Sequence, residues 1–155
     1  MIYVEISPTL PPHHRIAPEV LERAAREALH HRSAPSDATL AVVLTDDAQL
    51  HALNREYLGV DAPTDVLAFP ANETDPETGA PYLGDVLISV PRAAAQATTR
   101  GHPLVAEVQL LVVHGVLHLL GYDHASAEEK ARMWAAQAEV LERLGVVLGE
   151  DDVGE

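Results

Sequence analysis

The 155-residue sequence contains no cysteine, so it can form neither a disulfide bond nor a thiolate-bound metal site. It therefore has no disulfide partner, and any metal ion must be bound by histidine, aspartate or glutamate. Basic residues are also scarce. Ten Lys and Arg against 24 Asp and Glu give a net charge of −14, which argues against non-specific adhesion to nucleic acids or anionic membranes.

The sequence has no long uninterrupted apolar run. The most apolar stretch, residues 104–120, contains Glu107, Gln109, His114 and His118, so it falls short of a membrane span and we interpret it as a buried core helix. The N-terminus shows no basic segment followed by an apolar one, which excludes an evident secretory signal. We therefore expect a cytoplasmic protein with no membrane partner.

The rest of the composition, 47% apolar and 22% charged residues, is that of a soluble globular domain. Alternating and β-branched apolar residues predict four strands, at residues 2–6, 39–45, 65–69 and 85–90. Helical spacing with terminal signals predicts five helices: 18–31, a segment between the capping residues 45–47 and Gly59, 91–100, 103–120 and 126–144. Between the third and fourth strands, the polar residues 71–82 predict a loop or hairpin excursion.

These elements predict one α/β (α+β) domain over residues 1–149, with a mixed sheet of about four strands and about five helices. Residues 150–155 form an acidic segment that we expect to be a frayed tail.

The segment HGVLHLLGYDH, residues 114–124, contains the candidate metal-binding residues. His114 and His118 are four residues apart, so a helix places their imidazoles on one face, one turn apart. Gly121 can end that helix in the left-handed conformation and turn the chain back, which brings His124 to a third corner. We expect these three histidines to bind one divalent ion, Zn²⁺ in the first instance, on the central buried helix and the turn after it.

The same spacing occurs in the metzincin pattern H-E-x-x-H-x-x-G-x-x-H, in which three histidines bind zinc and one position stays open for hydrolysis. Here Gly115 replaces the glutamate that acts as general base, which disfavours peptide hydrolysis. A glycine inside a helix costs about 1 kcal/mol relative to alanine, so we interpret it as leaving room beside the metal. Asp123 is the candidate catalytic base or hydrogen-bond partner of the ligands.

The remaining chemistry-bearing residues favour a structural interpretation. Met133 is predicted to pack in the core rather than to form a metzincin Met-turn. The other histidines have no matching spacing and are predicted to be solvated: His13, His14, His30, His31, His51 and His102.

The histidine block resembles the H-G-x-L-H-L-x-G-Y-D-H signature of the YbeY family of rRNA maturation factors. Two further segments resemble family motifs in the same order, over residues 40–145 in all. Residues 61–70, DAPTDVLAFP, resemble D-x-P-T-D-V-L-S-F-P with Ala68 for the usual serine, and residues 83–89, LGDVLIS, resemble L-G-D-I-x-I-S.

The resemblance implies a single-strand-specific, metal-dependent endoribonuclease that acts in 16S rRNA 3′-end maturation and ribosome quality control. It implies zinc bound by His114, His118 and His124, a single-stranded rRNA precursor as substrate, and ribosomal subunit or assembly proteins as partners. The family usually has an arginine between Tyr57 and Gly59, where this sequence has Leu58. Arg55, on the same predicted helix, is the candidate substitute for RNA binding.

Two other functions stay open. Leu58 favours a ribosome assembly factor whose metal is structural and whose catalysis is lost, and a metallopeptidase-like hydrolase ranks third because the glutamate is missing.

Overall fold

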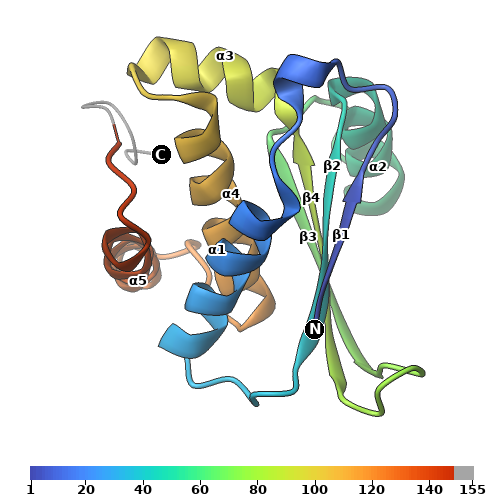
Figure 1. Cartoon of the computed structure of the whole chain (residues 1–155), viewed down its shortest axis with the longest axis vertical. Helices are drawn as coiled ribbons and strands as arrows, with labels where there is room; N and C mark the ends of the chain where they lie inside the picture. The colour runs from blue at the N-terminus through green and yellow to red at the C-terminus, as the bar shows by residue number, and fades with distance from the viewer. Residues whose placement is uncertain (149–155) are drawn as a thin grey trace.

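A computed structural model describes residues 1–148, and Figure 1 shows the arrangement of its elements. The predicted domain end at residue 149 and the acidic tail at 150–155 lie outside the described residues. Residues 1–148 contain four strands, five α-helices and a short 3₁₀ helix, in this order: β1 Ile2–Ile6, the 3₁₀ helix η1 Pro12–His14, α1 Pro18–His31, β2 Thr39–Thr45, α2 Asp47–Leu58, β3 Val66–Thr74, β4 Pro81–Ser89, α3 Val90–Arg100, α4 Leu104–Leu119 and α5 Ala127–Leu144.

The strands form one mixed sheet in the order β1-β2-β4-β3, which confirms the predicted α+β class. β1, β2 and β4 are parallel to one another, and β3 pairs with β4 antiparallel. Most helix ends also agree with the sequence signals. Ser126 and Glu129 form the predicted capping box of α5, and Gly59 ends α2 in the left-handed conformation.

The third and fourth strands are longer than predicted, because half of segment 71–82, residues 71–74 and 81–82, continues them as a β-hairpin, the second of the two predicted alternatives. Only residues 75–80 form the connection, where the Asp75 backbone N–H donates to the Ala80 carbonyl at 2.8 Å. The hydroxyl of Tyr3 donates to the buried Asp75 carboxylate at 2.7 Å and ties the hairpin to β1. Cross-strand pairing extends these strands despite their polar sequence, so hydrophobic alternation underestimates their length.

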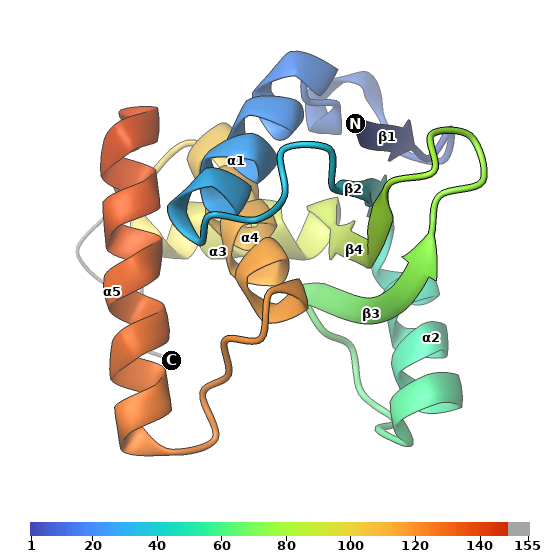
Figure 2. The same cartoon turned by 90° about the horizontal axis from the view of Figure 1, so that it is seen from below.

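Helices cover both faces of the sheet unequally. α1, α3, α4 and α5 lie on one face and α2 on the other, and Figure 2 shows α4 between α5 and the sheet. α4 contacts β3, β4 and three other helices, so it is the buried core helix that the sequence predicts. No single helix in the described part of the chain is long and apolar enough to span a membrane; α3 and α4 pass that test only as a pair, bent by 115°.

Gly115 serves the packing of α4 on the sheet, which corrects the prediction that it leaves room for the metal. A Cβ at this position would lie 2.5 Å from Cγ1 and 3.0 Å from Cγ2 of Val86 on β4. Glycine therefore allows the helix to approach the sheet closely, and both methyl groups of Val86 occupy the space.

Replacing Gly115 with alanine is expected to lower the free energy of unfolding by about 2 kcal/mol. In an ordinary helix this change would stabilise the protein by about 1 kcal/mol. Here both Val86 methyls face the new Cβ, so rotating the valine cannot relieve the clash. Urea unfolding of the Gly115→Ala, Val86→Ala and double variants tests this. The Gly115→Ala change should be neutral or stabilising in the Val86→Ala background, and equal losses in both backgrounds would contradict the packing role.

The corner between α3 and α4 contains a buried charged cluster that no sequence pattern predicts. The Glu107 carboxylate is fully buried and accepts from Arg100 at 2.9 Å, and it lies 2.6 Å from Nε2 of His102. The His102 side chain is only 2% exposed, so the prediction that it is solvated is wrong. His102 is buried because its ring nitrogen contacts the buried Glu107 carboxylate. Its sequence position, just after a helix end, is one that surface residues often occupy.

Candidate metal centre

The end of α4 sets the positions of the first two histidines. The helix runs to Leu119, so His114 and His118 lie one turn apart on the same face, with ring centroids 4.9 Å apart. Gly121 then adopts a φ of +102°, and the Tyr122 backbone N–H donates to the Leu117 carbonyl at 3.0 Å. This left-handed turn reverses the chain, as predicted from the glycine.

The turn brings His124 against the two helical histidines. Its ring centroid lies 5.7 Å from that of His114 and 5.1 Å from that of His118. One ring nitrogen of each histidine lies within 4.8 Å of those of the other two. Two nitrogens bound to one Zn²⁺ at about 2.1 Å lie at most about 4.2 Å apart, so small side-chain rotations bring all three onto one ion.

The three histidines are buried to different extents. His114 and His118 are half-buried and His124 is exposed, so the cluster lies at the surface end of the core helix. An ion bound by these three histidines would have its fourth coordination position on the exposed side, where water could reach it.

Gln137, which no sequence motif predicts as a site residue, orients the most buried histidine. This α5 residue is 2% exposed, and its Oε1 accepts from Nδ1 of His114 at 2.5 Å. The bond places the proton on Nδ1 and leaves the Nε2 lone pair for a metal ion. Its sequence signal is an amide on the otherwise apolar face that α5 buries with Met133 and Val140. Met133 itself lies in the core, as predicted.

Burial favours the neutral, metal-binding form of His114 and His118. Burial lowers the pKa of His114 from its ordinary value of 6.5 to about 4, against the opposing effect of its hydrogen bond to Gln137. Burial also lowers the pKa of His118, and the neighbouring His124 adds to that effect. A proton therefore competes weakly for these sites near neutral pH, which fits a metal centre.

The metal-free protein is expected to lose stability as the pH falls from about 6.5 to about 4. In this window the unfolded chain protonates its imidazole while folded His114 stays neutral, so protons favour the unfolded state. The pKa difference corresponds to a loss of about 3 kcal/mol once the pH is below both values. Urea unfolding at about pH 7 and about pH 4 should show a smaller loss in a His114→Gln variant. The same pH dependence in both proteins would contradict the assignment.

The two other predicted site residues lie at the surface. Asp123 is exposed, and its Oδ1 accepts from the backbone N–H of His124 at 2.7 Å, so it shapes the turn that carries the third ligand. Arg55 is exposed on α2 with its guanidinium 4.0 Å from Asp61, the only ion pair it forms among residues 1–148. Leu58 is 56% exposed at the end of the same helix. The roles of Asp123 in catalysis and of Arg55 in RNA binding stay predictions.

Known proteins resemble this chain over most of its length. The family described as Endoribonuclease YbeY matches residues 12–145, which extends the resemblance towards the N-terminus. A protein named Endoribonuclease YbeY from Pelotomaculum thermopropionicum is 48% identical over 130 residues, covering 82% of this chain and 86% of its own. A protein of the same name from Geobacillus kaustophilus is 44% identical over 135 residues, covering 83% and 86%.

The fold has a counterpart among solved structures. The solution structure of TM1509 from Thermotoga maritima matches with a TM-score of 0.61 and 25% identity, covering 93% of this chain and 89% of the other. The family match spans the histidine turn and the core helix that carries it, together with most of the sheet. The chain belongs to the endoribonuclease YbeY family.

Proposed function

We propose that this protein is a zinc-dependent endoribonuclease that cleaves single-stranded RNA in 16S rRNA 3′-end maturation and ribosome quality control. A cytoplasmic location and ribosomal subunit or assembly partners are part of the same proposal. The observation that carries it is the convergence of three histidines on one point with an accessible side. The endoribonuclease names of the relatives support RNA as the substrate.

His114, His118 and His124 would bind the ion. A divalent ion such as Zn²⁺ supplies Lewis acidity that polarises a phosphoryl oxygen and lowers the pKa of water, so hydrolysis does not require the glutamate that Gly115 replaces. Gln137 holds His114 in the metal-binding tautomer. Asp123 Oδ1 fixes the turn, and its Oδ2, which no hydrogen bond engages within the described residues, is the atom we assign to accept a proton during cleavage.

A cleavage assay with labelled RNA tests the proposal. Protein loaded with zinc should cut a single-stranded oligomer and spare the matched duplex, and chelation should abolish the cleavage until zinc is restored. Metal analysis should give one zinc per chain. Cleavage that survives chelation, or a zinc-loaded protein that cuts no single-stranded RNA, would reject the proposal.

Leu58 favours the second candidate, an assembly factor with a structural metal, because it places an exposed apolar side chain where the family usually has arginine. A metallopeptidase is the weakest alternative. Gly115 stands where the metzincin pattern has its glutamate base, and this glycine packs on Val86 and has no side chain that could act as a base.

A Leu58→Arg variant separates the first two candidates. In a nuclease, the added guanidinium is expected to raise kcat/KM on single-stranded RNA by about five- to tenfold, since it supplies a bidentate phosphate donor. The exposed position at a helix end accepts the change without loss of stability. Leu58→Gln is the matched uncharged control. Equal kcat/KM in the Leu58→Arg and Leu58→Gln variants would show that an arginine at this position does not contribute to RNA cleavage.

A further inference from the structure

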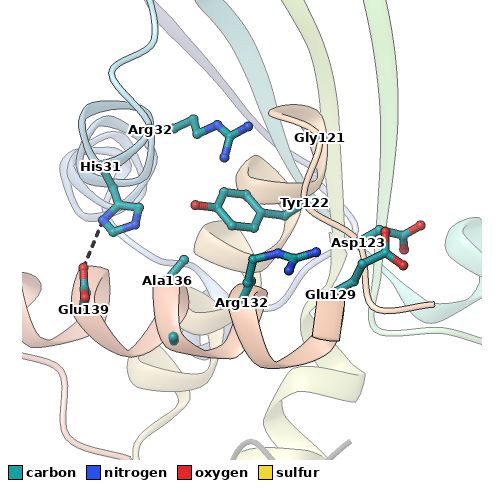
Figure 3. Close-up of a pocket in the computed structure, with 10 residues that line it drawn as sticks. His31, Arg32, Gly121, Tyr122, Asp123, Glu129, Arg132, Ala136 and Glu139 are labelled. Atoms are coloured by element: carbon teal, nitrogen blue, oxygen red, sulfur yellow. Dashed lines mark ion pairs between the residues drawn. The ribbon is translucent and has the colours of Figure 1, made fainter. Parts of the chain in front are cut away.

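A pocket of about 350 Å³ adjoins the turn that leads to His124. Its wall is formed by residues 121–123 of that turn, by Arg32 and His31 at the end of α1, and by Arg132 on α5. In Figure 3 the Tyr122 side chain projects between the two arginine side chains. We call this site the Tyr122 pocket. Because Asp123 lines the pocket and His124 follows it directly, a ligand strand can run from the metal centre into it.

The Arg32 guanidinium is preorganised for an anion. Its central carbon lies 4.9 Å from the centre of the Tyr122 ring, over the ring face. A guanidinium held over an aromatic ring keeps N–H donors that the ring does not use. Among the described residues, no carboxylate lies within 4.0 Å of Arg32. Arg132 is exposed, and its ion pair with Glu128 is long, at 4.0 Å.

Each of the three carboxylates in the pocket lining has one contact within the fold. Asp123 accepts from the backbone of His124, and Glu129 accepts from the backbone N–H of Ser126 at 3.1 Å in the capping box. Glu139 lies 3.5 Å from Nδ1 of His31, as the dashed line in Figure 3 marks. Arg32 and Arg132 are therefore the cationic groups that the pocket offers to a ligand, since neither is held by a short ion pair within the described residues.

We propose that the Tyr122 pocket binds a backbone phosphate of single-stranded RNA next to the nucleotides held at the metal centre. This inference rests on the proposed function and assigns Arg32 and Arg132 as phosphate ligands. A planar guanidinium suits a phosphate because two parallel N–H donors match two oxygens. The chain carries a net charge of −14, so it needs local cationic sites to bind RNA, and this pair lies beside the ligand turn.

Equilibrium binding of a single-stranded 2′-O-methyl RNA of about twelve nucleotides, which gel electrophoresis shows to stay intact during the measurement, tests this. Fluorescence anisotropy with zinc-loaded Arg32→Gln and Arg132→Gln proteins should show Kd raised by about five- to tenfold for each variant. The slope of log Kd against log salt should fall by about 0.7 per lost phosphate contact. Arg26→Gln is the matched control, because Arg26 is exposed on α1 and paired with Glu22 outside the pocket. A dinucleotide too short to reach the pocket should bind all four proteins equally.

Two results would overturn the inference. If Arg32→Gln and Arg132→Gln bind the long RNA with the affinity and salt dependence of Arg26→Gln, the pocket does not contact the strand, while the proposed nuclease function stands. If the wild-type protein neither binds nor cleaves single-stranded RNA, the proposed function is rejected, and this inference is rejected with it because it rests on that function. Zinc content measured in every variant separates a lost phosphate contact from a damaged metal centre.

Discussion

Replacing His124 with alanine is expected to lower kcat/KM for zinc-dependent cleavage of single-stranded RNA by at least about 1000-fold. The two histidines left on α4 supply only two ligands, fewer than the three that catalytic zinc sites use. His124 is the best ligand to remove because it is exposed and lies in the turn after the helix, outside the hydrophobic core. The metal-free variant should therefore unfold at the same temperature as the metal-free wild type.

The measurement combines zinc content, cleavage rate and thermal unfolding on each protein. His30→Ala is the matched control, because His30 is an exposed histidine near the end of α1 and contributes nothing to the cluster. It should keep one zinc per chain and full activity. A His124→Ala protein that retains both zinc and cleavage would show that the three-histidine site is not the catalytic centre.

Replacing Glu107 with glutamine is expected to lower the free energy of unfolding by about 3–4 kcal/mol. Its carboxylate is fully buried and binds the Arg100 guanidinium, whose side chain is 11% exposed. A neutral amide keeps the shape of the side chain but removes the negative charge that compensates the buried arginine. Glu107 lies two turns before His114 on α4, so the cluster fixes the start of the helix whose other end carries the metal ligands.

Urea unfolding of the metal-free proteins measures this effect without a contribution from metal binding. Glu128→Gln is the matched control, because the same change in an exposed α5 residue removes only a long surface ion pair. It should change the free energy of unfolding by less than about 0.5 kcal/mol. A loss below about 1 kcal/mol for Glu107→Gln would show that Arg100 does not depend on this carboxylate.

The sequence by itself determined the elements and the three histidines that cluster after folding. Apolar spacing and capping residues predicted the five helices to within a residue or two, because these signals act between residues close along the chain. The same local geometry predicted that His114 and His118 share a helix face and that Gly121 turns the chain. Those spacings were sufficient to indicate a metal centre before its geometry was known.

Only the tertiary structure decided how distant residues meet. Gly115 allows close packing of α4 against Val86 on β4. Gln137 on α5 forms a hydrogen bond with His114, and the buried Glu107 contacts His102. The hairpin of β3 and β4 likewise depends on pairing across strands rather than on alternation within one. Each of these contacts depends on how elements pack and on their register, and a pattern that repeats along one segment carries no information about the residue that will face it from another.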